Sequence, residues 1–138
     1  MLPEPYRLHH RADFSRTVRR GRRIGRPDLV VHVLVSADAV RVGGPRFGLI
    51  VSKAVGNAVV RHRVARRLRH ICAGLVGVLP AEADVVIRAM PGAAQADSAD
   101  LDRQVRGALR KSFPELAVPE SPHPAPPMGG ASESGRAS

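Results

Sequence analysis

The side chains best suited to chemistry with phosphate groups lie between Ser52 and His70, in the stretch SKAVGNAVVRHRVARRLRH. Five arginines fall within nine residues there: Arg61, Arg63, Arg66, Arg67 and Arg69. The guanidinium group can contact a phosphate through two parallel hydrogen bonds. A solvated helix face normally mixes both signs of charge, yet no Asp or Glu occurs between Arg46 and Ala81. This uninterrupted positive stretch predicts a nucleic-acid-binding surface.

A helix over about residues 57–75 would arrange these cations on defined faces. It would follow a tight connection that contains Lys53 and Gly56, and Asn57 would cap its first turn. At 3.6 residues per turn, one apolar stripe forms from Val60, Val64, Leu68, Ile71 and Leu75. The remaining positions divide into a face with His62, Arg66 and Arg69, and a flank with Arg63, Arg67 and His70.

The charge of the whole chain agrees with a polyanionic partner. The 138 residues carry a net charge of +10, and the pI is about 11.5. Residues 114–138 contain one Arg and three Glu, a net of −2, so residues 1–113 carry +12. With three Phe, one Tyr and no Trp, a broad aromatic platform for base stacking is hard to build. We therefore expect contacts to phosphate and to shape to dominate.

No constellation for catalysis by the protein itself is present. The sequence lacks an HExxH motif, a GxSxG elbow and a P-loop. A two-metal nuclease needs converging carboxylates, and Asp84, which opens a predicted strand, has no evident acidic companion. The single cysteine, Cys72, is predicted to be a small core residue. With no long apolar run and a polar start, the chain is expected to be cytoplasmic, with no membrane partner.

The other predicted elements form an α+β fold in the order α-β-β-α-β-α. A first helix over about residues 11–20 carries Phe14 and Val18 and stops at Gly21. Strands are predicted at residues 29–36, 47–52 and 83–90, and the first two are expected to form a hairpin. The composition assigns one small domain to residues 1–113 and a disordered Pro-, Ser-, Gly- and Ala-rich tail to residues 114–138.

The last predicted helix begins at Ser98, which is expected to cap it. Its apolar stripe comprises Leu101, Val105, Ala108 and Leu109, and its outer face comprises Arg103, Arg106, Arg110 and Lys111.

Two segments resemble a known family. FGLIVSKAVGNAVVRHRVARRLRH resembles the signature of the bacterial ribonuclease P protein subunit, and RLHHRADFSRTVRRG resembles the first helix of that family. The resemblance covers about residues 6–113. It implies a sandwich like domain 2 of ribosomal protein S5, with a left-handed crossover around the basic helix. It also implies an accessory subunit of an endoribonuclease whose catalytic RNA removes the 5′ leader of precursor tRNA with Mg²⁺.

The resemblance also implies site residues. The catalytic RNA would be bound by Lys53, Asn57, Arg61, His62, Arg63, Arg66, Arg67 and Arg69. A cleft between the first helix and the sheet would hold the 5′ leader, with Phe14, Arg16, Val18 and His32. From the residues alone, core packing is the favoured interpretation of Phe14. No catalytic residue and no metal ligand is assigned to the protein, because Mg²⁺ would be bound mainly by the RNA and the substrate.

The sequence departs from the family pattern at several positions. His62 stands at the central Asn of the motif, and Ala54 and Ala65 stand where lysines are common; Val18 and His32 occupy cleft positions that are often aromatic. Stacking on leader bases should therefore be weaker. The alternative from composition is a structural, ribosome-associated RNA-binding protein with no role in cleavage. A helix-turn-helix DNA-binding protein is disfavoured, because predicted strands flank the basic helix.

Overall fold

Nine elements follow one another along the chain in this computed structural model, which describes residues 2–35 and 44–114. The predicted tail therefore lies outside the described residues except for Pro114. The elements are η1 (Glu4–Tyr6), α1 (Arg11–Arg20), β1 (Arg22–Gly25), β2 (Leu29–Val35), β3 (Arg46–Ile50), α2 (Ala58–Ala73), β4 (Ala83–Ala89), η2 (Pro91–Ala94) and α3 (Ser98–Ser112). The predicted helices and strands are all present, and the α+β fold class is confirmed.

The four strands form one mixed sheet in the order β1-β2-β4-β3. The pairs β1–β2 and β2–β4 are antiparallel, whereas β3 and β4 are parallel. Parallel neighbours need a crossover connection, and α2 supplies it. The basic helix therefore lies between two adjacent parallel strands along the chain.

The expected hairpin between residues 29–36 and 47–52 is wrong, because β4 separates β2 from β3. The hairpin partner of β2 is β1, a strand that the sequence analysis did not predict. Only Ile24 is buried in its four residues, so β1 lacks the alternation that marks a strand. Pairing with β2 overrides this weak local signal, since Arg22 lies opposite Val33 and Gly25 opposite Val30.

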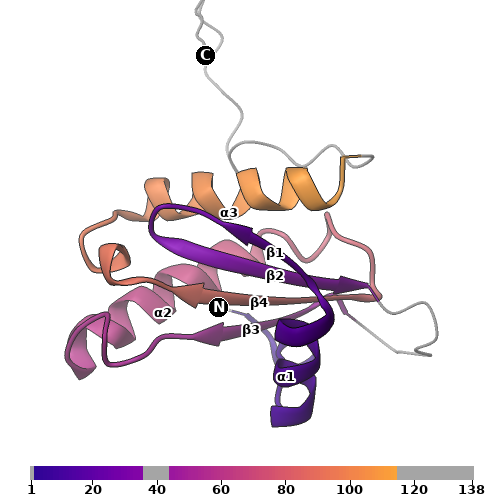
Figure 1. Cartoon of the computed structure of the whole chain (residues 1–138), viewed down its shortest axis with the longest axis horizontal. Coiled ribbons are helices and arrows are strands. Elements are labelled where there is room, and N and C mark those ends of the chain that lie inside the picture. The colour runs from indigo at the N-terminus through magenta and orange to yellow at the C-terminus, as the bar shows by residue number, and fades with distance from the viewer. Residues whose placement is uncertain (1, 36–43, 115–138) are drawn as a thin grey trace, which may run out of the picture.

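The main core lies between the sheet and the two longer helices, α2 and α3, whereas α1 packs at the other face of the sheet (Figure 1). Strand alternation sends Leu29, Val31 and Val33 of β2 into this core. The predicted apolar stripe of α2 lies in the same core, and its Val64 and Leu68 are completely buried. Burial of each such side chain contributes about 1.5–3 kcal/mol, so the stripe fixes which faces of α2 remain outside.

The N-caps of α2 and α3 are short polar side chains, but the cap of α3 differs from the prediction. Asn57 caps α2 as predicted, because its side-chain oxygen accepts a hydrogen bond from the Val60 N–H at 3.0 Å. The cap of α3 is Asp97 rather than Ser98, and its carboxylate accepts from the Asp100 N–H at 2.8 Å. A carboxylate at this position also gains from the positive end of the helix dipole, which a Ser hydroxyl does not.

Arg106 is a correction to the predicted outer face of α3. Its side chain is buried, with 1% of its surface exposed, and its Nε donates to the Asp102 carboxylate at 2.8 Å. It reaches the end of α2, where a Cβ at Gly74 would lie 3.4 Å from Nη2 of Arg106. The buried charge is tolerated because an acid four residues away neutralises it within α3.

Candidate nucleic-acid interface

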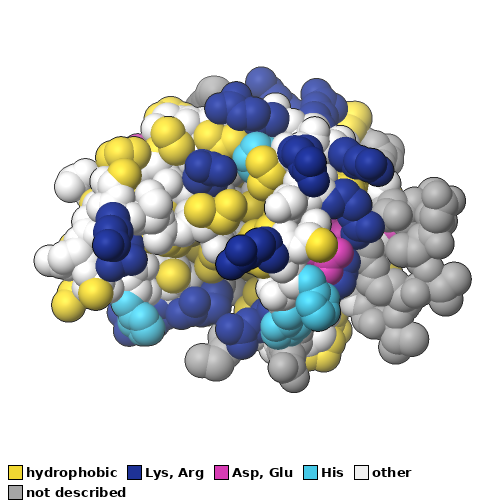
Figure 2. Space-filling view, turned by 60° about the horizontal axis from the view of Figure 1, so that its bottom comes forward, with side chains coloured by type: hydrophobic (Ala, Val, Ile, Leu, Met, Phe, Trp, Pro, Cys, Tyr) yellow, Lys and Arg dark blue, Asp and Glu magenta, His cyan; other side chains and the backbone are white. Residues whose placement is uncertain are grey.

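The arginines of α2 have no acidic partner among the described residues, whereas four other arginines of the protein have one. Elsewhere in the described residues, ion pairs with Asp are made by Arg16, Arg46, Arg103 and Arg106. Within residues 2–35 and 44–114 no carboxylate pairs with Arg61, Arg63, Arg66 or Arg69. On the side that carries α1 and β3, Lys and Arg side chains are spread over the face and acidic ones are scarce (Figure 2). Such cations are available to an external polyanion.

Burial divides the His and Arg side chains of α2 into three groups, and all of these residues except His70 belong to the predicted RNA-binding set. His62, Arg66 and His70 are exposed along its outermost ridge. Arg61 and Arg69 are half-buried on the flank nearest β3. Arg63 and Arg67 are half-buried on the opposite flank. The structure therefore presents the cations on more than half of the circumference of the helix.

Arg67 has a structural contact that the sequence did not indicate. Its Nη1 donates to the backbone carbonyl of Ala96 at 2.8 Å, immediately before the cap of α3. The side chain thus ties α2 to the connection between η2 and α3. Of the eight predicted RNA-binding residues, Arg67 and the capping Asn57 are those whose side chains make a hydrogen bond within the described residues.

The turn before α2 presents Lys53, which is exposed. Gly56 closes this turn with a φ of 158°, and a Cβ there would lie 2.9 Å from the Val60 Cβ. This close approach requires a glycine, so the turn holds Lys53 next to the first turn of the basic helix.

Three of the four predicted cleft residues, Phe14, Arg16 and Val18, lie on α1 and are half-buried. The ring of Phe14 lies directly against Gly48 of β3, where an added Cβ would overlap Cε1 and Cζ of the ring. Phe14 therefore packs α1 onto the sheet, as the core-packing interpretation predicts, while part of its surface stays accessible.

Gly48→Ala should displace the Phe14 ring and lower the free energy of unfolding by about 1–3 kcal/mol, the usual cost of overpacking. Gly25→Ala is the matched control, because a Cβ at Gly25 of β1 meets nothing within 4 Å. Urea denaturation of both variants measures the difference. Equal stability of the two variants would contradict the placement of Phe14 on Gly48.

His32 lies on the same face of the sheet as α1, in the register row that joins Arg23, His32, Val86 and Gly48. Its side chain is buried, with 4% of the residue exposed, and Nδ1 has no hydrogen-bond partner in the described residues. Burial lowers the pKa of His32 below 6.5, and the charges of Arg88 and Arg23 lower it further. The imidazole is therefore neutral near pH 7, and its hydrogen-bonding capacity at Nδ1 is unused.

The lowered pKa of His32 predicts a loss of stability in acid. Below pH 6.5 the unfolded chain binds a proton at His32 that the folded chain resists, so the free energy of unfolding should fall as pH drops below 6.5. His32→Gln should reduce this fall, whereas His70→Gln, at an exposed position of α2, should not. Thermal melting between pH 7.5 and 5.5 tests this, and a parallel fall for wild type and His32→Gln would refute it.

Four charged residues form a cluster between α1 and the sheet that the sequence did not indicate. Asp84 of β4 has 1% of its side chain exposed and receives two hydrogen bonds from Arg46 of β3, both at 3.0 Å. Arg16 lies 3.7 Å from Asp84 and 3.3 Å from Asp13, and Arg46 lies 3.5 Å from Asp13. The two carboxylates raise the pKa of Arg46. Arg16, predicted to bind the leader, therefore also helps to hold α1 on the sheet.

The described residues contain no group of three or more His, Cys, Asp or Glu side chains that could hold a metal ion. Cys72 is completely buried, as predicted, and burial raises the pKa of its thiol far above the usual value. In the same part of the chain, no helix is long and apolar enough to cross a membrane.

The fold and the interface define a small α+β protein with a dense, unpaired basic helix, a class suited to binding RNA. The family model for ribonuclease P matches residues 2–112. The chain is 70% identical over 129 aligned residues to the ribonuclease P protein component of Nocardia farcinica, with 80% of this chain and 83% of that protein covered. The protein component of Rhodococcus jostii is 67% identical over 112 residues, covering 79% and 90%.

The solved structure of the ribonuclease P protein from Staphylococcus aureus superposes with a TM-score of 0.65 at 26% identity, covering 81% of this chain and 93% of that one. The chain belongs to the ribonuclease P protein family. It is an accessory protein subunit of a tRNA-processing endoribonuclease, and its family implies an RNA partner. This assignment favours the subunit over the alternative of a structural RNA-binding protein without a role in cleavage.

Proposed function

We propose that α2 and the turn before it bind the catalytic RNA of ribonuclease P. The observation that carries this proposal is the concentration of Arg61, Arg63, Arg66 and Arg69 on one helix, with no carboxylate partner for any of them in the described residues. Lys53 extends the same charge beyond the start of the helix. Asn57 and Arg67 act mainly by positioning α2. The side chain of Asn57 caps the first turn of the helix, and that of Arg67 binds the connection that leads to α3.

The face of the sheet that carries α1 binds the 5′ leader of precursor tRNA in this proposal. Phe14 and Val18 supply one partly accessible aromatic ring and one aliphatic surface, and the neutral imidazole of His32 lies buried in the same face. Arg23 and Arg88 are exposed on the same face and supply charge for the leader phosphates. Arg88 is not among the predicted site residues, although period-2 alternation from Asp84 and Val86 places it on this face.

The protein positions the substrate, and the RNA carries out the cleavage. Asp13 and Asp84 are already neutralised by Arg16 and Arg46, so the described residues do not offer a carboxylate set that fits Mg²⁺. We propose that Mg²⁺ is bound mainly by the RNA subunit and the substrate, where it would supply the nucleophile for hydrolysis. The proposed compartment is the cytoplasm.

Cleavage of precursor tRNA at low Mg²⁺ tests this function directly. The catalytic RNA from the same bacterium is assayed with and without the protein, beside a protein-only control. We expect the protein to restore cleavage at the mature 5′ end and to cleave nothing alone. A protein that binds the RNA without stimulating cleavage would contradict the proposal and favour a structural RNA-binding role.

A further inference from the structure

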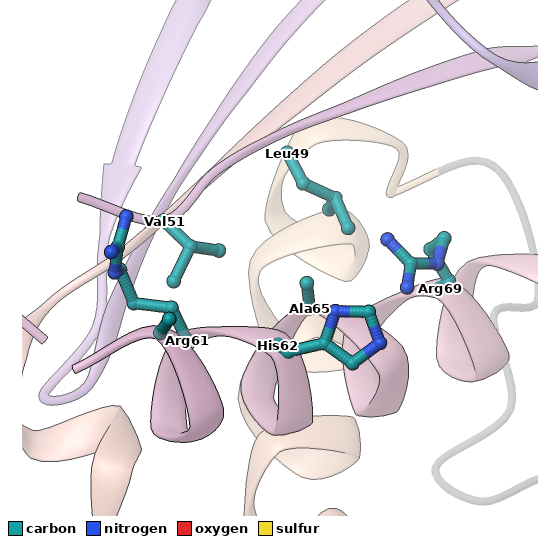
Figure 3. A pocket seen from close by; sticks show the side chains of 7 residues that line it. Leu49, Val51, Arg61, His62, Ala65 and Arg69 are labelled. Carbon is teal, nitrogen blue, oxygen red and sulfur yellow. The ribbon is translucent and has the colours of Figure 1, made fainter. Parts of the chain in front are cut away.

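A hollow of about 370 Å³ lies between the edge strand β3 and the basic helix α2 (Figure 3). Side chains from Leu49 and Val51 on one side and from Arg61, His62, Ala65 and Arg69 on the other line it. Its volume falls at the lower end of the range of small-ligand pockets. Phosphate contacts by Arg63 and Arg66 do not use this space, because neither residue lines it.

The lining separates apolar and cationic groups. Leu49 and Val51 form the wall on the β3 side and Ala65 forms the floor, whereas Arg61 and Arg69 lie at opposite ends (Figure 3). The two arginines are eight residues apart on one helix, which corresponds to about 12 Å along its axis. None of the lining residues is acidic. An occupant should therefore have a flat or compact apolar body with negative charge on both sides.

Two details favour an occupant that accepts hydrogen bonds. The Nε of Arg61 is buried and has no hydrogen-bond partner in the described residues, so an acceptor in the hollow would satisfy it. His62 is exposed at the mouth of the hollow and can stack on a ring or bond to its edge. Ala65, four residues from each of the two arginines, leaves the floor open because its side chain is a single methyl group.

We propose that this hollow binds one nucleotide of the RNA subunit that is turned out of its stack. The base would lie between Leu49, Val51 and Ala65, and Arg61 and Arg69 would contact the phosphates on its two sides. This inference rests on the proposed binding of the catalytic RNA by α2. It adds a contact to a base, whereas the arginines of α2 outside the hollow, Arg63 and Arg66, offer contacts to phosphates.

Ala65→Leu tests the inference because it fills the floor of the hollow without changing the charge. The affinity for the RNA subunit should fall about 10-fold, the usual scale of one lost base contact, while the dependence on salt should stay that of wild type. Ala99→Leu makes the same substitution at an exposed position of α3 and should bind like wild type. Thermal melting of both variants verifies that they fold.

A second measurement varies the RNA, and its first arm uses the wild-type protein alone, so that arm does not depend on the folding of a variant. Each unpaired nucleotide of the RNA subunit is replaced in turn by an abasic one. We expect one abasic position to weaken binding about 10-fold for the wild type and to have no effect for Ala65→Leu. The inference is overturned if no abasic position matters, or if Ala65→Leu binds as tightly as wild type.

These outcomes distinguish a failure of the proposed nucleotide site from a failure of the proposed function. If the wild type binds the RNA subunit specifically and Ala65→Leu binds it equally well, only the nucleotide site is wrong. If the wild type binds the RNA subunit no more tightly than an unrelated RNA of the same length, the proposed function and the inference both fail.

Discussion

Replacement of both Arg66 and Arg69 by alanine should weaken binding of the catalytic RNA by about 10- to 100-fold at about 0.1 M salt. Neither guanidinium has a carboxylate partner in the described residues, so each is free to displace counterions from an RNA phosphate. The slope of the logarithm of the affinity against the logarithm of the salt concentration should become shallower by about 1 to 2. Filter binding across a range of salt concentrations measures both quantities.

The matched control for this variant is Arg103→Ala with Lys111→Ala on α3. It removes the same two positive charges from exposed helix positions, so a loss that depended only on net charge would be equal for the two proteins. We expect the α3 variant to bind nearly like wild type. A wild-type affinity and an unchanged slope for the α2 variant would show that α2 is not the surface that binds the RNA.

Asp84→Ala should lower the free energy of unfolding by about 3 kcal/mol. The carboxylate is almost completely buried and pairs with Arg46 at 3.0 Å and Arg16 at 3.7 Å, so its removal leaves Arg46 without its main partner and Arg16 with Asp13 alone. For a domain of this size the loss corresponds to a decrease in Tm of roughly 10–20 °C. Urea denaturation and thermal melting measure it.

Asp100→Ala is the control, because Asp100 forms an ion pair with Arg103 on the exposed side of α3. Surface pairs contribute about 0–1 kcal/mol, so this variant should lose little stability. A second variant, Asp84→Leu with Arg46→Met, removes the buried carboxylate together with its half-buried partner and should recover much of the loss, since apolar groups tolerate burial. If Asp84→Ala and Asp100→Ala lost the same stability, the cluster would not be what fastens α1 to the sheet.

The cluster also links stability to the site. Asp13 and Arg16 belong to α1, and Asp84 and Arg46 belong to the sheet, so the four charges fix the helix that carries Phe14 and Val18. In the proposed function this fixes the surface for the leader. The predictions for Asp84 and Gly48 therefore probe the same interface by charge and by packing.

The local elements could be predicted because their signals are local. The helix start at Asn57 and the buried stripe through Val64 and Leu68 follow from residues three or four positions apart, which share one face of a helix. The long basic motif identified the family in the same way. The prediction of β1 failed because Arg22–Gly25 lacks an alternating pattern, and the cap of α3 was misplaced by one residue because Asp97 and Ser98 both suit the position.

What the sequence determined by itself is the presence of the basic helix, its buried face, its excess of positive charge and the family to which the chain belongs. The tertiary structure alone decided the strand order that brings Asp84 next to Arg46, the burial of Arg106, the attachment of Arg67 to Ala96, and the hollow beside Ala65. The contacts of Arg46 with Asp84 and of Arg67 with Ala96 join residues 38 and 29 positions apart. The residues that neighbour each of these positions in the sequence do not indicate its partner, because the packing of whole helices against the sheet determines which side chains meet.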